Sequence, residues 1–354
     1  MRQKSLGVVR WLGVLLLVMA QGTAYSADYY WVGGSGDWSD INHWATTSGG
    51  WVTHFTVPSP SDDVYFDANS FTGPGQSVNM NLNIITCDDF DCTQAPYLPK
   101  FVSSPSTKVE IYGSMLLRPE IIYLINSELH FQSQTAGNEI RTAGQILMRN
   151  IYFSGPGGGW ILSDTLFAYS NEIHLKEGNL NTNGQTIYCS QFNSNYAFTR
   201  SLNLSNSHLY IAATWTSNTT NLTVFAGSSR IHLLSPGASF MSTGPGTIGF
   251  HNLYFTALTG SAVLNAGAIS FNRVVFSSAG VLGGTNTYGD LILTNSKRYL
   301  FTTSSMHIFL DSLKAVGHCL SPIRFECIQG TAGFSKSIQT KGNCLRRDTT
   351  ITLG

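Results

Sequence analysis

The amino-acid sequence predicts an all-β protein that folds as a right-handed parallel β-helix, a β-solenoid with coils of about 22 residues. The first observation is a triplet of hydrophobic, polar or aromatic, and hydrophobic residues that recurs every 22 residues. The second is that short alternating segments are bounded by turn residues such as those of 181–184, and no helical period is sustained in the repeating region. A fixed period of this length with strand-like triplets indicates stacked coils.

The repeat changes phase once. The triplets are Leu129-His130-Phe131, Ile151-Tyr152-Phe153 and Ile173-His174-Leu175 and then, after a step of 14 residues, Ile187-Tyr188-Cys189, Leu209-Tyr210-Ile211, Ile231-His232-Leu233 and Leu253-Tyr254-Phe255. Either a shortened coil or a change to a different strand of the same coil would produce the step. Cys189 occupies an inward position of its triplet, so we predict a buried free thiol there.

Residues 1–26 have the pattern of a secretory signal peptide. Arg2, Lys4 and Arg10 precede an apolar run over 11–20, and the small residues near Ser26 suit cleavage. The apolar run is shorter than the ~20 residues of a spanning helix, and no later segment reaches that length. We therefore expect a secreted or cell-surface protein without a transmembrane segment after signal cleavage.

Residues 27–99 are predicted to form an N-terminal cap and the first coils. This region has nine acidic residues, all Asp, and no Lys or Arg. It also contains Trp31, Trp38, Trp44 and Trp51. Tryptophan faces bind sugars, which makes Trp31, Trp38 and Trp44 candidate ligand-binding residues, but an apolar solenoid also needs large side chains to seal its end. Sealing is the interpretation we favour.

The Asp residues of this cap suggest a possible calcium site. Ca²⁺ prefers carboxylate and carbonyl oxygens, and Asp62, Asp63 and Asp67 lie in one short segment. Their spacing matches no EF-hand loop, and Asp is common in turns because it accepts hydrogen bonds from nearby backbone. We favour the turn role and keep Ca²⁺ as the one candidate cofactor.

Residues 100–354 are predicted to form the β-helix body with a basic, cysteine-containing tail. The middle residues of the triplets, among them Tyr152, Tyr188, Tyr210 and Tyr254, should point outward in one stripe because their neighbours point inward. Such a stripe could stack sugar rings, which makes these four tyrosines candidate ligand-binding residues. The competing interpretation, which we favour, is aromatic stacking between strands.

Two segments of the cap resemble a known family. The pattern Trp-x-Gly-Gly-x-Gly-x-Trp over 31–38 and the sequence Asp-Asp-Val-Tyr-Phe-Asp over 62–67 are similar to a module of large secreted and cell-surface proteins of Bacteroidetes-type bacteria. The resemblance implies a parallel β-helix outside the cell and implies no particular chemistry. Family members often end in a sorting domain that is missing here, so we expect either a truncated chain or a different export route.

Charge and acid distribution bear on function. Without the signal peptide the net charge is about −3, which gives no general electrostatic reason to bind nucleic acid. Many pectin-lyase-like β-helices cleave polysaccharides with clustered carboxylates, yet no Asp or Glu occurs from 178 to 289. Glu128 and Glu172, two coils apart, would be separated by ~10 Å, at the far limit for an inverting pair.

We therefore expect a secreted or surface-exposed structural or adhesive module without catalytic activity. Its expected partners are extracellular glycans or surface proteins. The alternative is an extracellular protein that binds or cleaves carbohydrate through the outer stripe or the tryptophan-rich cap.

Overall fold

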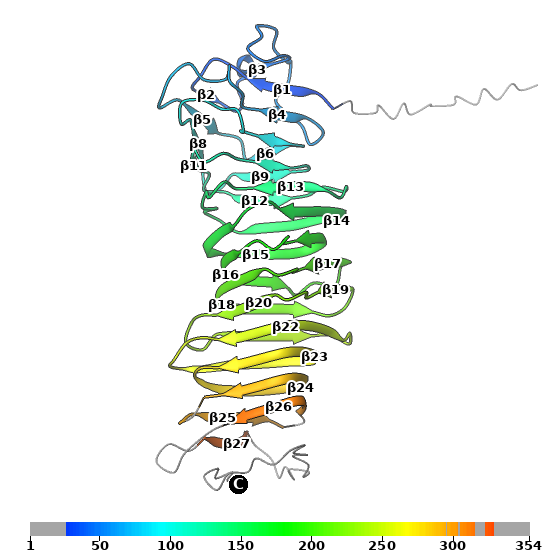
Figure 1. Ribbon diagram of the computed structural model, residues 1–354. Helices are drawn as coiled ribbons and strands as arrows, with labels where there is room; N and C mark the ends of the chain where they lie inside the picture. Colours follow the sequence, from blue (N-terminus) through cyan, green and yellow to red (C-terminus); the bar gives the residue numbers. More distant parts are fainter. Residues whose placement is uncertain (1–25, 295, 304, 316–322, 329–354) are drawn as a thin grey trace, which may run out of the picture.

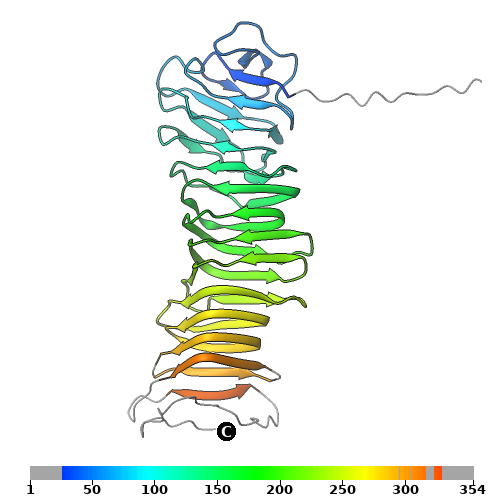
Figure 2. The same ribbon diagram turned by 45° about the vertical axis from the view of Figure 1, so that its right-hand side comes forward.

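The computed structural model describes residues 26–294, 296–303, 305–315 and 323–328, and it is a parallel β-solenoid of about 12 turns (Figure 1). The predicted fold class and the coil length of about 22 residues are confirmed. Within the described ranges the helical structure is limited to one 3-10 turn, η1 (Ile41–His43). The coils stack into an elongated molecule with the cap at one end (Figure 2).

Each coil contributes three strand segments, which stack into three ladders that we name faces A, B and C. Along the chain a coil visits face B, then face A, then face C. Face A consists of β6 (Ile84–Cys87), β9 (Lys108–Ile111), β12 (Glu128–Phe131), the start of β14 (Ile151–Leu162), the middle of β15 (Leu166–Asn181), the ends of β16 (Ile187–Ser194) and β18 (His208–Asn218), β21 (Ser239–Thr243), the starts of β23 (Ser261–Phe276) and β24 (Ala279–Leu293), β25 (Arg298–Thr302) and β27 (Arg324–Ile328).

Face B begins as a separate four-stranded sheet and continues at the same place in the coil order. It consists of β2 (Gly36–Asp37), β5 (Ser77–Met80), β8 (Lys100–Ser103) and β11 (Ile122–Leu124), then the starts of β15, β16 and β18, β20 (Arg230–Leu233), and the ends of β22 (Ile248–Phe255), β23, β24 and β26 (Met306–Ala315). The long strands bend and so belong to more than one face.

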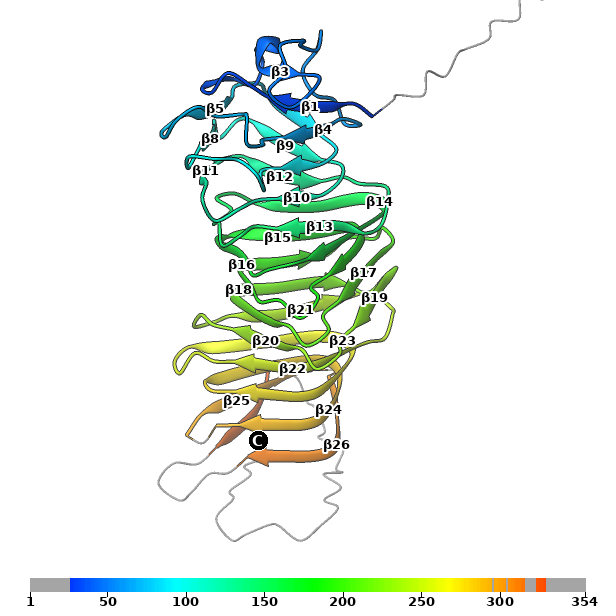
Figure 3. The same ribbon diagram turned by 45° about the horizontal axis from the view of Figure 1, so that its top comes forward.

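Face C closes the coil. It consists of β1 (Asp28–Trp31), β4 (Asp63–Tyr65), β7 (Phe90–Asp91), β10 (Met115–Leu116), β13 (Asn138–Arg141), the ends of β14 and β15, β17 (Arg200–Asn203), β19 (Leu222–Phe225), the start of β22, the middles of β23 and β24, and the start of β26. Seen with the cap tilted forward, the strands of β14, β15 and β16 turn from one side of the stack to another (Figure 3).

The pairing register explains the 14-residue step. Ile173 pairs with Phe192 on face A, whereas Leu166 pairs with Ile187 on face B. The first three triplets therefore lie on face A, and those from Ile187 onward lie on face B. Of the two explanations open from the sequence, the change to a different strand of the same coil is correct.

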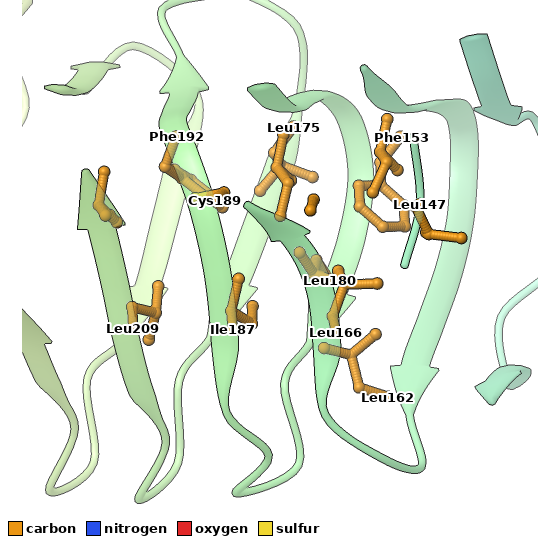
Figure 4. Packing of buried hydrophobic residues seen from close by; sticks show 14 of the residues in the cluster. Leu147, Phe153, Leu162, Leu166, Leu175, Leu180, Ile187, Cys189, Phe192 and Leu209 are labelled. Atoms are coloured by element: carbon orange, nitrogen blue, oxygen red, sulfur yellow. The ribbon is translucent and has the colours of Figure 1, made fainter. Parts of the chain in front are cut away.

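The core consists of the inward residues of all three faces. Figure 4 shows Leu166, Ile187 and Leu209 on successive coils, each pointing into the interior, with Cys189 and Phe192 beside them. All five are buried. The prediction for Cys189 is confirmed, because its thiol is both buried and free. Each coil thus buries its side chains against the next, as stacked repeats require.

An aromatic cluster covers the first coils. β1 pairs antiparallel with β3 (Trp44–Ala45) and parallel with β4. The indoles of Trp31 and Trp44 meet edge-on at 5.0 Å between ring centres, those of Trp38 and Trp44 at 4.7 Å, and Trp44 packs on Phe66 at 6.1 Å. These three tryptophans have no exposed surface. Trp31, Trp38 and Trp44 therefore present no face to a ligand, and sealing, the interpretation favoured from the sequence, is the role that fits them.

Residues 1–25 of the predicted signal peptide and residues 329–354 of the predicted basic tail lie outside the described residues. Within the described ranges no helix has the length and apolarity needed to cross a membrane.

Candidate functional site

A stripe of stacked rings runs along the outer side of face B. It consists of Phe167, Tyr188, Tyr210, His232 and Tyr254 on five successive coils. Ring centres are separated by 5.4, 5.0, 4.8 and 4.9 Å, and neighbouring planes lie within 16° of parallel. Because neighbouring coils cover the faces of the inner rings, the stripe offers ring edges and hydroxyl groups to solvent. The predicted stacking between strands is therefore present, and Tyr188 and Tyr210 have no free ring face for a sugar.

Tyr152 does not belong to this stripe. It lies on face A between the rings of His130 and His174, at 4.4 and 4.5 Å between ring centres. The change of face at the 14-residue step explains why. We predicted one outward stripe from the sequence, whereas the structure has two shorter stripes on different faces. Tyr152 is therefore separated from Tyr188, Tyr210 and Tyr254.

A column of polar residues lies beside the face B stripe. In the pairing register His208 lies next to Arg230, Arg230 next to Asn252, Asn252 next to Arg273, and Arg273 next to Asp290. Each is the residue immediately before the hydrophobic triplet of its coil. This column was not predicted from the sequence, although His208, Arg230 and Asn252 are spaced by the same 22 residues as the triplets that follow them.

The two arginines of this column differ in their partners. Arg273 donates two hydrogen bonds to Asp290, at 3.0 Å from Nε and 2.6 Å from Nη2, while Ser312 donates to the other carboxylate oxygen at 2.5 Å. Arg230 is exposed, and its Nη1 donates to Nε2 of His208 at 3.3 Å. Among the described residues no carboxylate lies within ion-pair distance of Arg230.

The cationic surroundings affect His232. Burial lowers the pKa of the His232 imidazole, and the positive charges of His208 and Arg230 lower it further. Nδ1 of His208 and Nε2 of His232 are buried without a hydrogen-bond partner in the described part of the chain. Arg230 therefore places a positive charge beside the stripe, and among the described residues no carboxylate pairs with it.

The cap has a second exposed feature, which we name the aromatic hairpin (residues 44–55). Its arms are joined by hydrogen bonds from the Thr46 amide to the Val52 carbonyl at 2.9 Å and from the His54 amide to the Trp44 carbonyl at 2.8 Å. Trp51 is 91% exposed and Phe55 is 96% exposed. Trp51 therefore does not help to seal the end of the solenoid. Nothing in the sequence around it distinguishes it from the buried tryptophans of the cap.

The base of the aromatic hairpin is fixed to the cap. The ring of His54 stacks on Tyr29 at 3.7 Å between ring centres, and its Nε2 lies 3.0 Å from the Asp28 carbonyl. Two large apolar side chains are therefore held in solvent by a hydrogen-bonded loop.

The three Asp residues proposed for calcium are engaged with the protein. Asp62 accepts hydrogen bonds from the amides of Ala27 and Ser59, at 3.1 and 2.8 Å. Asp63 accepts from the Asp89 amide at 3.1 Å, and Asp67 accepts from a turn amide and a hydroxyl. These are the contacts expected of turn-capping residues. Over the described ranges no group of three or more His, Cys, Asp or Glu is arranged to hold a metal ion.

Face A carries the two carboxylates considered for polysaccharide cleavage. Glu128 accepts a hydrogen bond from the Tyr152 hydroxyl at 3.3 Å, and its other oxygen lies 3.3 Å from Nε2 of His130. Glu172 lies 3.1 Å from Nε2 of His174, which in turn stacks on Tyr152. The two Glu–His pairs are therefore linked through the single ring of Tyr152.

Comparison of the chain with protein-family models, with curated proteins and with solved structures found no significant match. The molecule is thus defined by its own geometry as a parallel β-solenoid with a capped N-terminal end, a stacked outer stripe and an exposed aromatic hairpin.

Proposed function

We propose that the protein is a secreted or surface-exposed structural module that adheres to a partner outside the cell and has no catalytic activity. The observation that carries this proposal is the aromatic hairpin at the end of an elongated stack of about 12 turns. At ~4.8 Å per coil the stack is roughly 55 Å long, enough to hold the hairpin away from an attachment point.

Exposed apolar side chains of this size support a contact role. Solvent-exposed aromatic residues cost free energy in water, and when they are grouped they mark interaction sites. Trp51 and Phe55 belong to one fixed loop, so a partner would meet a preformed surface. Extracellular glycans and surface proteins are the partners we propose.

Binding assays on the full chain test this proposal. We expect wild-type protein to be retained by at least one member of a panel of immobilised neutral polysaccharides and extracellular matrix proteins. The double variant Trp51→Ser, Phe55→Ser should lose most of that retention. Phe198→Ser, which removes a different exposed ring, should not. Equal retention of the double variant, or no retention of wild-type protein, would overturn the adhesive role.

The second candidate is a carbohydrate-cleaving protein, which the Glu128–Tyr152–His174–Glu172 arrangement on face A favours. At two coils the carboxylates are ~10 Å apart, close to the 6.5–9.5 Å range of inverting glycosidases. Release of reducing or unsaturated ends from any polysaccharide of the panel, lost in Glu128→Gln and Glu172→Gln, would replace the non-catalytic proposal with this one.

A further inference from the structure

We propose that the face B stripe is a binding site for an acidic polysaccharide, with Arg230 holding a carboxylate or sulfate group and the tyrosines on either side of His232 hydrogen-bonding to the sugar chain. This inference goes beyond the proposed function, because it assigns a second surface and a ligand class. The stripe lies on the long side of the solenoid and does not include the aromatic hairpin, so the two proposals can fail separately.

The positive charge beside the stripe is unbalanced. Arg230 is exposed, and the chain contains no Asp or Glu from 178 to 289. The carboxylate nearest in the column, that of Asp290, is already bonded to Arg273 and Ser312. A guanidinium with free donors binds carboxylate or sulfate through charge-assisted hydrogen bonds, often two at once. Arg230 is therefore available for an anion in a way that Arg273 is not.

The stripe also carries a row of available hydroxyl groups. Tyr188, Tyr210 and Tyr254 direct ring edges outward, and in the described part of the chain their hydroxyls have no hydrogen-bond partner. The spacing of the rings, 4.8–5.0 Å along these coils, is close to the length of one pyranose unit in an extended chain. A polysaccharide lying along the stripe would therefore pass a tyrosine hydroxyl on three of the four coils from Tyr188 to Tyr254.

The described groups around His232 also favour a bound anion. The groups that face His232 are His208 and Arg230 of the neighbouring column, with Tyr210 and Tyr254 stacked on its two ring faces. None of them is an acid. A bound anion would supply the missing negative charge and favour the protonated imidazole. Binding should therefore strengthen as pH falls from 7 towards the lowered pKa of His232.

The geometry of the stripe favours an extended acidic polysaccharide over other macromolecules. The stripe has one ring on each coil, and the polar groups beside it also repeat coil by coil, which fits an extended polymer better than a globular partner. Nucleic acid would satisfy the charge but would need several cations along its phosphates. Among the described residues of this column, Arg230 alone is an arginine without a carboxylate partner.

The test measures binding of full-length protein to polygalacturonate, with dextran as the uncharged sugar and single-stranded DNA as the non-sugar polyanion. We expect binding to polygalacturonate only. Arg230→Gln should weaken it by about tenfold or more, as expected for loss of a charged hydrogen bond. Arg149→Gln is the matched control, since it removes an exposed arginine that lies outside the stripe.

Each outcome decides the proposal. The proposal is supported if Arg230→Gln loses affinity for polygalacturonate while Arg149→Gln keeps it. It is also supported if wild-type protein binds more tightly at lower pH and Arg230→Gln reduces this pH effect. Equal loss in both arginine variants, equal affinity for DNA, or no binding to polygalacturonate would overturn it. The Trp51→Ser, Phe55→Ser variant should bind polygalacturonate normally, so failure of the hairpin proposal leaves this result unaffected.

Discussion

Arg200 shows how a charged residue can occupy the core of an acid-free region. Its side chain is 2% exposed. Its guanidinium donates to the Ser194 hydroxyl at 2.8 Å and to the carbonyls of Ser194, Phe198, Asn218 and Thr220. Burial lowers the pKa of Arg200 to about 10. Backbone oxygens of two coils thus take the place of a carboxylate partner.

We predict that Arg200→Met destabilises the protein by about 3 kcal/mol, because several buried carbonyls would lose their donor. Arg200→Lys should lose less, since an ammonium keeps three donors. Thermal unfolding followed by circular dichroism measures both effects. Arg149→Met, at an exposed arginine bonded to Asn126, is the control and should leave the melting temperature nearly unchanged. An unchanged melting temperature in Arg200→Met would show that these hydrogen bonds do not stabilise the fold.

Asp88 makes the stability of the cap depend on pH. Burial, with the negative charges of Asp63, Asp89 and Asp62, raises the pKa of Asp88 to about 6. Folding therefore favours the protonated carboxyl group of Asp88. Its contribution to the stability of the fold is fully present below the unfolded pKa of ~3.9 and is lost as pH rises through about 6. We predict that Asp88→Asn melts at a higher temperature than wild type at pH 7 and that the difference disappears near pH 4. The reverse order at pH 7 would refute this.

At the scale of elements, β15 is the strand in which the visible repeat changes face. Its first residues pair with Ile187 onward on face B, and its middle residues pair with Phe192 onward on face A. On face A the apolar repeat continues through Phe192, Trp215 and Phe240, but without the pattern of an aromatic or His between aliphatics. The sequence motif was therefore easier to follow on face B.

The ladders predict which deletions the fold tolerates. Leu209 pairs with Ile231, and Ile231 pairs with Leu253. Deleting residues 231–252 should place Leu253 on Leu209 and preserve the stack, with a fall in melting temperature on the order of 5 °C. Deleting only 231–241 should place later strands on the wrong faces and abolish cooperative unfolding. The two variants are compared by circular dichroism, and similar behaviour would contradict the three-face register.

At the scale of the whole molecule, the features that depend on the periodicity of the sequence could be predicted from it. The coil length, the inward residues and the buried Cys189 all follow from side-chain alternation. The candidate surfaces were harder to predict because they depend on details that alternation does not contain. Trp44 and Trp51 have similar sequence surroundings, yet a hydrogen-bonded turn sends one inward and the other into solvent. The charge on Arg230 stands out only once its neighbours in other coils are known.

Calcium bound in the cap would stabilise the entire stack of coils. Both carboxylate oxygens of Asp62, and one each of Asp63 and Asp67, already accept hydrogen bonds from backbone amides. We therefore expect millimolar Ca²⁺ to change the melting temperature by less than about 1 °C relative to a chelator-treated sample. A rise of several degrees would instead support calcium binding at these residues.

The contrast between Trp51 and the other tryptophans gives the molecule a built-in optical reporter. Trp31, Trp38, Trp44, Trp160 and Trp215 are at most 1% exposed, whereas Trp51 is 91% exposed. An aqueous quencher such as iodide should therefore remove the red-shifted emission of Trp51 and leave the blue-shifted emission of the interior. A partner that covers the aromatic hairpin would protect that emission from the quencher, and a ligand on the long side of the solenoid would not.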